Sequence, residues 1–215
     1  MCGRFQASSS PAELARWFNT TGPVPNVQQR YNAAPTQTLP IVLRGPETGK
    51  RRLAALRWGL IPSWAGDVKV AYSMFNAMAE TVAIKPAFRD AFKSRRCLVP
   101  ADGFYEWKQL DATTKQPYRI AMADGSPMAL AGLWEQWNAP VSGETVKTFA
   151  IITTAPNALC APIHNRMPVI LDAADYAAWL GEVPVRSDEL QALLRPYPAE
   201  RMEAHMIGPE IGNEE

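Results

Sequence analysis

Short runs of apolar, β-branched and aromatic residues recur through most of the sequence, and turns rich in Gly, Pro, Asn or charged residues separate them. Runs of this length and composition are typical of β-strands joined by tight turns. The runs expected to form strands span residues 39–44, 52–60, 96–100, 118–123, 128–134, 148–154 and 167–171. They predict an α+β fold with a strongly curved, mainly antiparallel and barrel-like sheet that carries short helices.

Four short helices are expected around this sheet. Residues 10–13 read Ser-Pro-Ala-Glu, a capping-box pattern with proline at the first helical position, which predicts a helix start. Leu14, Trp17 and Phe18 follow at helical spacing and are expected to face the core. The other helices are predicted over 86–93, after Asp172 with an end at Gly181, and over 187–194.

The length of the chain bounds its organisation. At 215 residues it suits one domain with a sizeable core, and the sequence shows no repeat, low-complexity stretch or linker. We therefore expect a single domain over residues 1–215. The acidic end, residues 209–215, is expected to be frayed.

The charge balance and the cysteines limit the possible partners. The sequence has 22 basic and 21 acidic residues, so any site for a polyanion must be a local patch. Its 3 cysteines include no CxxC pair, which argues against a disulfide framework or metal cluster and fits a reducing cytosol. Signal-peptide patterns and apolar runs of about 20 residues are missing from the sequence. We expect a cytoplasmic protein without metal, cofactor or membrane association.

Cys2 lies between Met1 and Gly3, so removal of Met1 would leave a free α-amine and a thiol on one residue. Because an α-amine has an ordinary pKa of about 7.7–8.0, a minority of it is neutral and nucleophilic at pH 7. Such an aminothiol can condense with an aldehyde to a Schiff base, and the thiol can then close a thiazolidine ring. Taken alone, this position is a weak signal, because many chains carry such a cysteine by chance.

Three other polar residues stand beside apolar runs. Asn76 is either a helix cap, the simpler interpretation, or an amide directed into a cleft. Glu106 lies among aromatic residues that would raise its pKa toward the range of general acid–base catalysis, and a surface glutamate in a turn fits the local sequence equally well. His164 titrates near neutrality and can move protons, although lone loop histidines usually have a structural role only.

The other two cysteines have simpler interpretations. Cys97 lies in an apolar run and is expected in the core. Cys160 precedes His164 by four residues, but Pro162 between them disfavours a shared helical face and hence a Cys–His pair.

Six blocks of this sequence, taken in order, resemble the successive motifs of the SRAP (SOS response-associated peptidase) family. The blocks are MCGRF at 1–5, YNAAP at 31–35, RWGLIPSW at 57–64, NA with ET within 76–81, CLVPADGFYEW at 97–107 and IHNRMP at 163–168. The match runs in order from residue 1 to about residue 171, which makes coincidence a poor explanation.

The resemblance implies abasic-site processing through a covalent crosslink to abasic sites in single-stranded DNA. On this basis Cys2, exposed after removal of Met1, attacks the ring-opened deoxyribose at C1′ and ends as a stable thiazolidine. Asn76 would position the N-terminal residue. Glu106 would move protons during ring opening and Schiff-base formation, and His164 would support catalysis and reversal of the adduct.

The resemblance also implies contacts that hold single-stranded DNA by phosphate pairing and base stacking. Arg4 and Arg166 match phosphate contacts of the family, Pro35 matches a wedge against the stacked bases, and Trp64 matches an aromatic platform. Met78 departs from the family pattern, in which arginine is common, and the C-terminal segment lacks the usual basic ending. These departures predict weaker DNA binding or a different substrate.

The expected partner is therefore single-stranded DNA that contains abasic sites, bound by a monomer in the cytoplasm or at the nucleoid without an obligate protein partner. Two other functions fit part of the sequence. A peptidase that uses Cys2 as an N-terminal nucleophile, and that could remove Met1 from itself, explains Cys2 and Glu106 but gives Trp64 and Pro35 no role. A non-catalytic module for single-stranded DNA would leave Cys2 inert.

Overall fold

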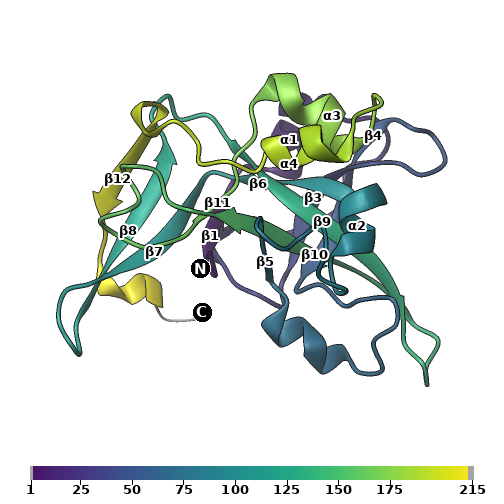
Figure 1. The fold of residues 1–215 in the computed structure, drawn as a ribbon, viewed down its shortest axis with the longest axis horizontal. Helices are drawn as coiled ribbons and strands as arrows, with labels where there is room; N and C mark the ends of the chain where they lie inside the picture. Colours follow the sequence, from purple (N-terminus) through teal and green to yellow (C-terminus); the bar gives the residue numbers. More distant parts are fainter. Residues whose placement is uncertain (1, 213–215) are drawn as a thin grey trace.

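A computed structural model describes residues 2–212, and its regular structure is mainly β-sheet with short helices (Figure 1). The strands are β1 (Phe5–Ala7), β2 (Arg30–Ala33), β3 (Thr38–Arg44), β4 (Arg51–Trp58), β5 (Asn76–Met78), β6 (Arg96–Ala101), β7 (Gly103–Gln109), β8 (Lys115–Met122), β9 (Met128–Asn138), β10 (Thr145–Thr154), β11 (Met167–Pro168) and β12 (Met202–Met206). The helices are α1 (Pro11–Trp17), α2 (Arg89–Ser94), α3 (Tyr176–Leu180) and α4 (Ser187–Ala192), with 3₁₀ turns η1 (Val68–Ser73), η2 (Ala173–Asp175), η3 (Ala199–Arg201) and η4 (Pro209–Gly212).

Five strands close on themselves into a barrel-like sheet. The ring has the strand order β4, β3, β6, β9 and β10. Each strand pairs antiparallel with the next in this order, and a parallel pair between β10 and β4 closes the ring. β5 and β11 add to β10 outside this ring. Closure gives the strands of the ring hydrogen-bonded neighbours on both sides and requires strong curvature. The predicted curved, mainly antiparallel core is confirmed.

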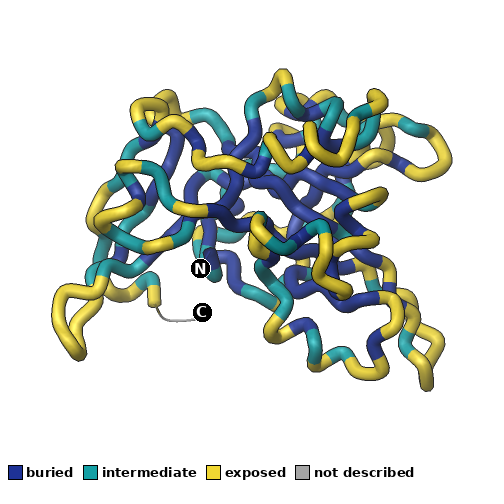
Figure 2. The backbone as a smooth tube through the Cα atoms, viewed as in Figure 1, coloured by how far each residue is buried: buried dark blue, intermediate teal, exposed yellow. Residues whose placement is uncertain are grey.

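A second sheet lies beside the barrel and has the order β12-β8-β7-β1-β2, with antiparallel pairs throughout. The short strand β1 lies between two neighbours, because Phe5 pairs with Ala33 of β2 and with Phe104 of β7. β6 of the barrel runs through Asp102 into β7, so the two sheets are joined at this point. The buried residues concentrate where the sheets meet (Figure 2).

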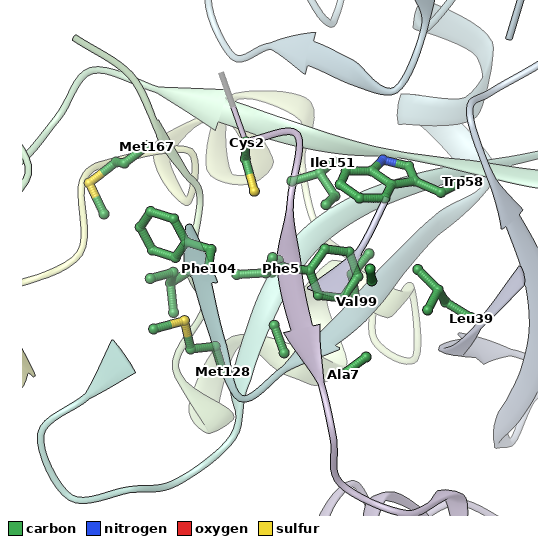
Figure 3. Close-up of a cluster of buried hydrophobic side chains, with 14 of the residues drawn as sticks. Cys2, Phe5, Ala7, Leu39, Trp58, Val99, Phe104, Met128, Ile151 and Met167 are labelled. Atoms are coloured by element: carbon green, nitrogen blue, oxygen red, sulfur yellow. The ribbon is translucent and has the colours of Figure 1, made fainter. Parts of the chain in front are cut away.

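An aromatic group holds the junction of the sheets together (Figure 3). Trp58 at the end of β4 lies with its ring 5.0 Å from that of Phe5 and stacks at 6.1 Å on Phe149 of β10. Its indole N–H donates to the carbonyl of Phe75 at 2.9 Å, just before β5. Each aromatic pair contributes about 0.5–1.5 kcal/mol beyond its burial. Trp58 therefore fixes β1, β10 and the start of β5 relative to one another.

The helix start predicted at Ser10 is confirmed, but one of its apolar residues lies elsewhere than expected. The Ser10 hydroxyl accepts from the Glu13 N–H at 3.3 Å, and the Glu13 carboxylate accepts from the Ser10 N–H at 2.7 Å, which completes the capping box. Leu14 and Phe18 are buried, whereas Trp17 is 54% exposed. Because successive residues are about 100° apart around a helix, Trp17 is turned away from Phe18 and stays at the rim of the contact.

Four other predicted elements differ from the structure in extent. The helix expected over 86–93 begins at Arg89, after turns, and the helix expected after Asp172 is divided into η2 and α3, which ends at Gly181 with a φ of 75°. The strand expected over 167–171 is reduced to β11, with one further bridge from Ile170 to Leu130. α4 ends two residues before the predicted limit.

The structure also corrects the interpretation of Asn76 as a helix cap. Asn76 begins strand β5, which pairs in parallel with β10 in the register Asn76 to Ile151. The backbone of β10 supplies hydrogen-bonding partners at this point, and these partners outweigh the local capping preference.

The C-terminal end is more ordered than expected as far as residue 212. Residues 209–212 form η4, and the amide of Asn32 donates to the carbonyl of Ile211 at 3.0 Å. The rest of the segment expected to fray, residues 213–215, lies outside the described residues. Between residues 2 and 212, none of the helices is long and apolar enough to cross a membrane.

Candidate active site

Cys2 lies three residues before the start of β1, at the junction of the two sheets. Phe5 pairs with Phe104, and the N–H of Tyr105 donates to the carbonyl of Arg4 at 3.0 Å. This antiparallel register places the residues before β1 beside the part of β7 that contains Glu106. Cys2 is fully buried, and its sulfur points into the cluster around Phe104 (Figure 3).

Asn76 reaches the same residue from the barrel side. Its side-chain N–H group donates to the carbonyl of Cys2 at 3.1 Å and to the carbonyl of Phe75 at 3.0 Å. Its amide oxygen is buried and has no hydrogen-bond partner among residues 2–212. An unmatched buried acceptor is costly, so the oxygen is a ready acceptor for an N–H group brought into the site.

Glu106 lies on β7 and is 3% exposed, which corrects the alternative of a surface glutamate in a turn. Burial disfavours its charged form and raises the pKa of the carboxyl to about 7. The sequence predicted the direction of this shift from the aromatic neighbours. A carboxyl with this pKa is about half protonated at neutral pH and can act as either acid or base.

His164 faces this carboxyl across 3.9 Å, measured from Nε2 to a carboxylate oxygen of Glu106. The other ring nitrogen, Nδ1, has two contacts with the backbone of Arg166. The Arg166 N–H lies 3.1 Å away and requires Nδ1 to accept a hydrogen bond, whereas the Arg166 carbonyl lies 3.3 Å away and would require Nδ1 to donate one. We assign the accepting role to Nδ1 on the shorter distance, which puts the proton of the neutral ring on Nε2, facing Glu106. Partial burial lowers the pKa of His164 below its ordinary value and favours this neutral form.

Two buried thiols lie close to Glu106. Burial raises the pKa of Cys2 well above its usual range, and the nearby Glu106 carboxylate adds to this effect. Burial together with Glu106 likewise raises the pKa of Cys160 to about 12. Both sulfurs are therefore thiols at neutral pH, and attack by either sulfur needs a base that removes the proton.

Arg166, a predicted phosphate contact, already has a protein partner. Its guanidinium forms a two-pronged ion pair with Glu80 at 2.7 and 3.0 Å and also donates to the Thr153 carbonyl at 2.7 Å. This pair is partly exposed, since the Glu80 side chain is 51% accessible. Arg4 is half-buried and donates to the Asn32 side chain at 3.2 Å.

The other DNA-contact candidates lie on separate segments. Pro35 is half-buried in the turn after β2, next to the strand that pairs with β1. Trp64 lies between β4 and η1 with 64% of its surface exposed, as a stacking platform requires. Met78 ends β5 opposite Thr153, the residue that also holds Arg166, and is 49% exposed.

The comparisons with known proteins agree on one family. The sequence model of the family described as "SOS response associated peptidase (SRAP)" matches residues 1–214. The chain belongs to the SRAP family. It is 45% identical over 215 residues to the abasic site processing protein YoqW of Bacillus subtilis, covering 99% of this chain and 95% of that protein. It is 32% identical to the abasic site processing protein HMCES of Xenopus tropicalis over 99% of this chain and 75% of that protein.

Solved structures extend the likeness to the fold. A crystal structure of a protein from Bacteroides thetaiotaomicron matches this SRAP chain with a TM-score of 0.89 and 27% identity, covering 97% of this chain and 93% of that one. A second, from Bordetella bronchiseptica, matches with a TM-score of 0.81 and 27% identity over 96% of this chain and the whole of that one.

Sequence reasoning missed three residues that shape this SRAP site. Glu80 was only part of a motif, although it holds Arg166, and Asn32 holds Arg4. Cys160 was set aside as a partner of His164, yet it is buried, and the Glu106 carboxylate adds to the effect of burial in raising its pKa. Glu80 and Asn32 are far along the chain from the arginines that they hold, so no local pattern pointed to them. The four-residue spacing from Cys160 to His164 was the one usable signal. Within residues 2–212, no group of 3 or more His, Cys, Asp or Glu side chains could hold a metal ion.

Proposed function

We propose that this SRAP protein acts as a single domain and as a monomer, and that it processes abasic sites in single-stranded DNA by a covalent bond to Cys2. The similarity to abasic site processing proteins supports abasic-site processing. The observation that carries the covalent step is the convergence on Cys2: Asn76 holds its carbonyl, and a buried Glu106 with a raised pKa lies beside it.

The proposed chemistry uses the amine before the thiol. After removal of Met1, the neutral Cys2 amine adds to the C1′ aldehyde of the opened sugar, and loss of one water gives an iminium ion. The Cys2 sulfur then adds to the same carbon and loses its proton, which closes the thiazolidine ring. Because burial keeps the thiol protonated, the amine is the better first nucleophile and the sulfur needs a nearby base.

Glu106 suits the proton transfers of this sequence. Its protonated form can give a proton to the departing hydroxyl, and the resulting carboxylate can then accept the proton of the thiol. His164 lies 3.9 Å from this carboxyl, and its neutral imidazole can exchange a proton with it, so we assign it to reversal, in which the C–S bond breaks and water hydrolyses the iminium.

The proposed contacts to DNA are made by Arg4, Arg166, Pro35 and Trp64. Arg166 meets a phosphate only if Glu80 shares or releases it, because the ion pair already uses both terminal nitrogens of Arg166. The exposed Trp64 ring provides a surface on which bases stack irrespective of sequence.

The proposal is tested by intact-mass measurement after mixing the protein with an abasic single-stranded oligonucleotide. We expect a species with the mass of the protein lacking Met1 plus the oligonucleotide, less one water. A matched oligonucleotide with an intact base in place of the abasic site should give no such species. Turnover of peptides without an adduct would instead support the peptidase, and reversible binding alone would support the non-catalytic module.

Met78→Arg is expected to tighten noncovalent binding of single-stranded DNA. The new cation would lie at the end of β5 near Arg166, and one added phosphate contact should steepen the log–log dependence of affinity on salt by about 0.7. Fluorescence anisotropy across a salt series measures both quantities. Met206→Arg is the matched control, because Met206 is 69% exposed on β12. Equal slopes for the two variants would contradict a phosphate contact at position 78.

A further inference from the structure

A polar cavity lies apart from Cys2, between the ends of β3, α2 and α3. It has a volume of about 580 Å³, and its wall contains the four cations Arg44, Lys93, Arg95 and Arg96. Among residues 2–212, the side chains that line this cavity include no Asp or Glu. Because basic and acidic residues nearly balance over the whole chain, 22 against 21, this cluster is a local excess of positive charge.

Among residues 2–212, one of the four cations has an acidic partner. Arg95 pairs with Glu135 at 2.8 Å. Among residues 2–212, the ion pairs include none with Arg44, Lys93 or Arg96. Cations gathered without carboxylates repel one another, and a bound anion removes that repulsion.

Two of the guanidinium groups converge on one part of the wall. A Cβ atom on Gly181 would lie 3.3 Å from Nη2 of Arg96 and 4.0 Å from Nη1 of Arg44. Gly181 has a φ of 75°, which favours glycine, and the missing side chain leaves the two groups open to the same space.

Arg96 also has a structural role, which accounts for only part of this arrangement. Its Nε donates to the Trp179 carbonyl at 2.6 Å, and its Nη1 donates to the carbonyls of Phe92 and Lys93 at 2.8 and 2.7 Å. These bonds cap the ends of α2 and α3 and hold a buried guanidinium rigidly. They leave Nη2 toward Gly181, and they give no reason for Arg44 and Lys93 to line the same cavity.

We infer that this cavity binds a phosphate monoester, with the phosphate held by Arg44, Lys93 and Arg96. A monoester carries close to two negative charges at neutral pH, and guanidinium forks match phosphate oxygens well. The volume suits a small organic ligand, and Trp134, Val183 and Val185 supply an apolar wall for the rest of it. The monoester can come from a free nucleotide or from the 5′ end of a DNA strand.

The first test is calorimetric titration of the full chain with deoxyadenosine monophosphate (dAMP). We expect saturable binding, at least tenfold weaker in Arg44→Gln and in Lys93→Gln, since each removes a charge-assisted contact. Deoxyadenosine, which lacks the phosphate, should not bind. Arg89→Gln is the matched control, because Arg89 lies on the same helix as Lys93 but outside the cavity lining. Thermal melting checks that each variant is folded.

The second test compares oligonucleotides with a 5′-phosphate and a 5′-hydroxyl. A preference for the 5′-phosphate that Arg44→Gln removes would identify the DNA end as the source, and binding of dAMP without such a preference would identify the free nucleotide. Crosslinking to abasic DNA should be unchanged in Arg44→Gln. The inference is overturned if dAMP fails to bind at millimolar concentration and the 5′-phosphate gives no preference, or if both substitutions leave binding unchanged.

Discussion

Cys2→Ala is expected to abolish the covalent adduct with abasic single-stranded DNA. The substitution keeps the α-amine that removal of Met1 would release, but it deletes the sulfur that closes the thiazolidine. Any Schiff base that still forms is open to hydrolysis, so no stable species should survive denaturing gel electrophoresis. Because Cys2 is buried, losing its sulfur should also cost about 1 kcal/mol of folding stability, which leaves the fold intact.

Cys2→Ser separates the two chemical roles of the residue. It retains the amine and should give a Schiff base that borohydride traps, without the stable adduct that forms in the absence of reductant. The matched control is Cys160→Ala, which removes the other buried thiol near Glu106 and should leave crosslinking close to normal. A normal, stable adduct from Cys2→Ala would refute the mechanism.

Glu106→Gln is expected to slow adduct formation by about 10²–10⁴-fold. Glutamine keeps the shape of the side chain but cannot give a proton to the departing hydroxyl or accept one from the thiol. Single-turnover time courses of crosslinking measure the effect, with the amount of bound DNA held constant. A rate within a few-fold of the unmodified protein would remove Glu106 from the chemistry.

The raised pKa of Glu106 also predicts how the rate depends on pH. The carboxyl is protonated below about 7 and loses its acid function as the pH rises through that value. The Cys2 amine changes in the opposite sense, because it becomes nucleophilic only as the pH approaches its pKa of about 7.7–8.0. Adduct formation should therefore pass through a maximum near neutrality, and Glu106→Gln should lose the decline on the alkaline side.

His164→Ala is expected to prolong the life of the preformed adduct more than it slows formation. Transfer of the crosslinked protein to a second abasic strand measures reversal, and the effect should again be about 10²–10⁴-fold if proton transfer is lost. Equal effects of the Glu106 and His164 substitutions on both steps would defeat this division of labour.

Local patterns in the sequence predicted much of the fold. Most of the predicted strand runs, the capping box at Ser10 and the helix end at Gly181 were recovered, because each depends on residues close together along the chain. The run over 167–171 forms only the two-residue strand β11. The raised pKa of Glu106 could also be predicted, since its aromatic neighbours are adjacent in sequence. The error at Asn76 arose because strand pairing with β10 outweighed a local capping preference, and the error at Trp17 arose because its position around the helix turns it to the rim of the contact.

The sequence by itself determined the chemical groups of the site: an aminothiol precursor at Cys2, an amide, a carboxyl and an imidazole, together with membership of a family through ordered motifs. Only the tertiary structure decided their arrangement. Asn76 meets Cys2 because β5 pairs with β10 and Trp58 fixes both beside β1. Glu106 on β7 and His164 in the loop before β11 come to within 3.9 Å of each other. Pairing between strands far apart in the chain depends on the whole sheet closing, and a local pattern does not encode that closure.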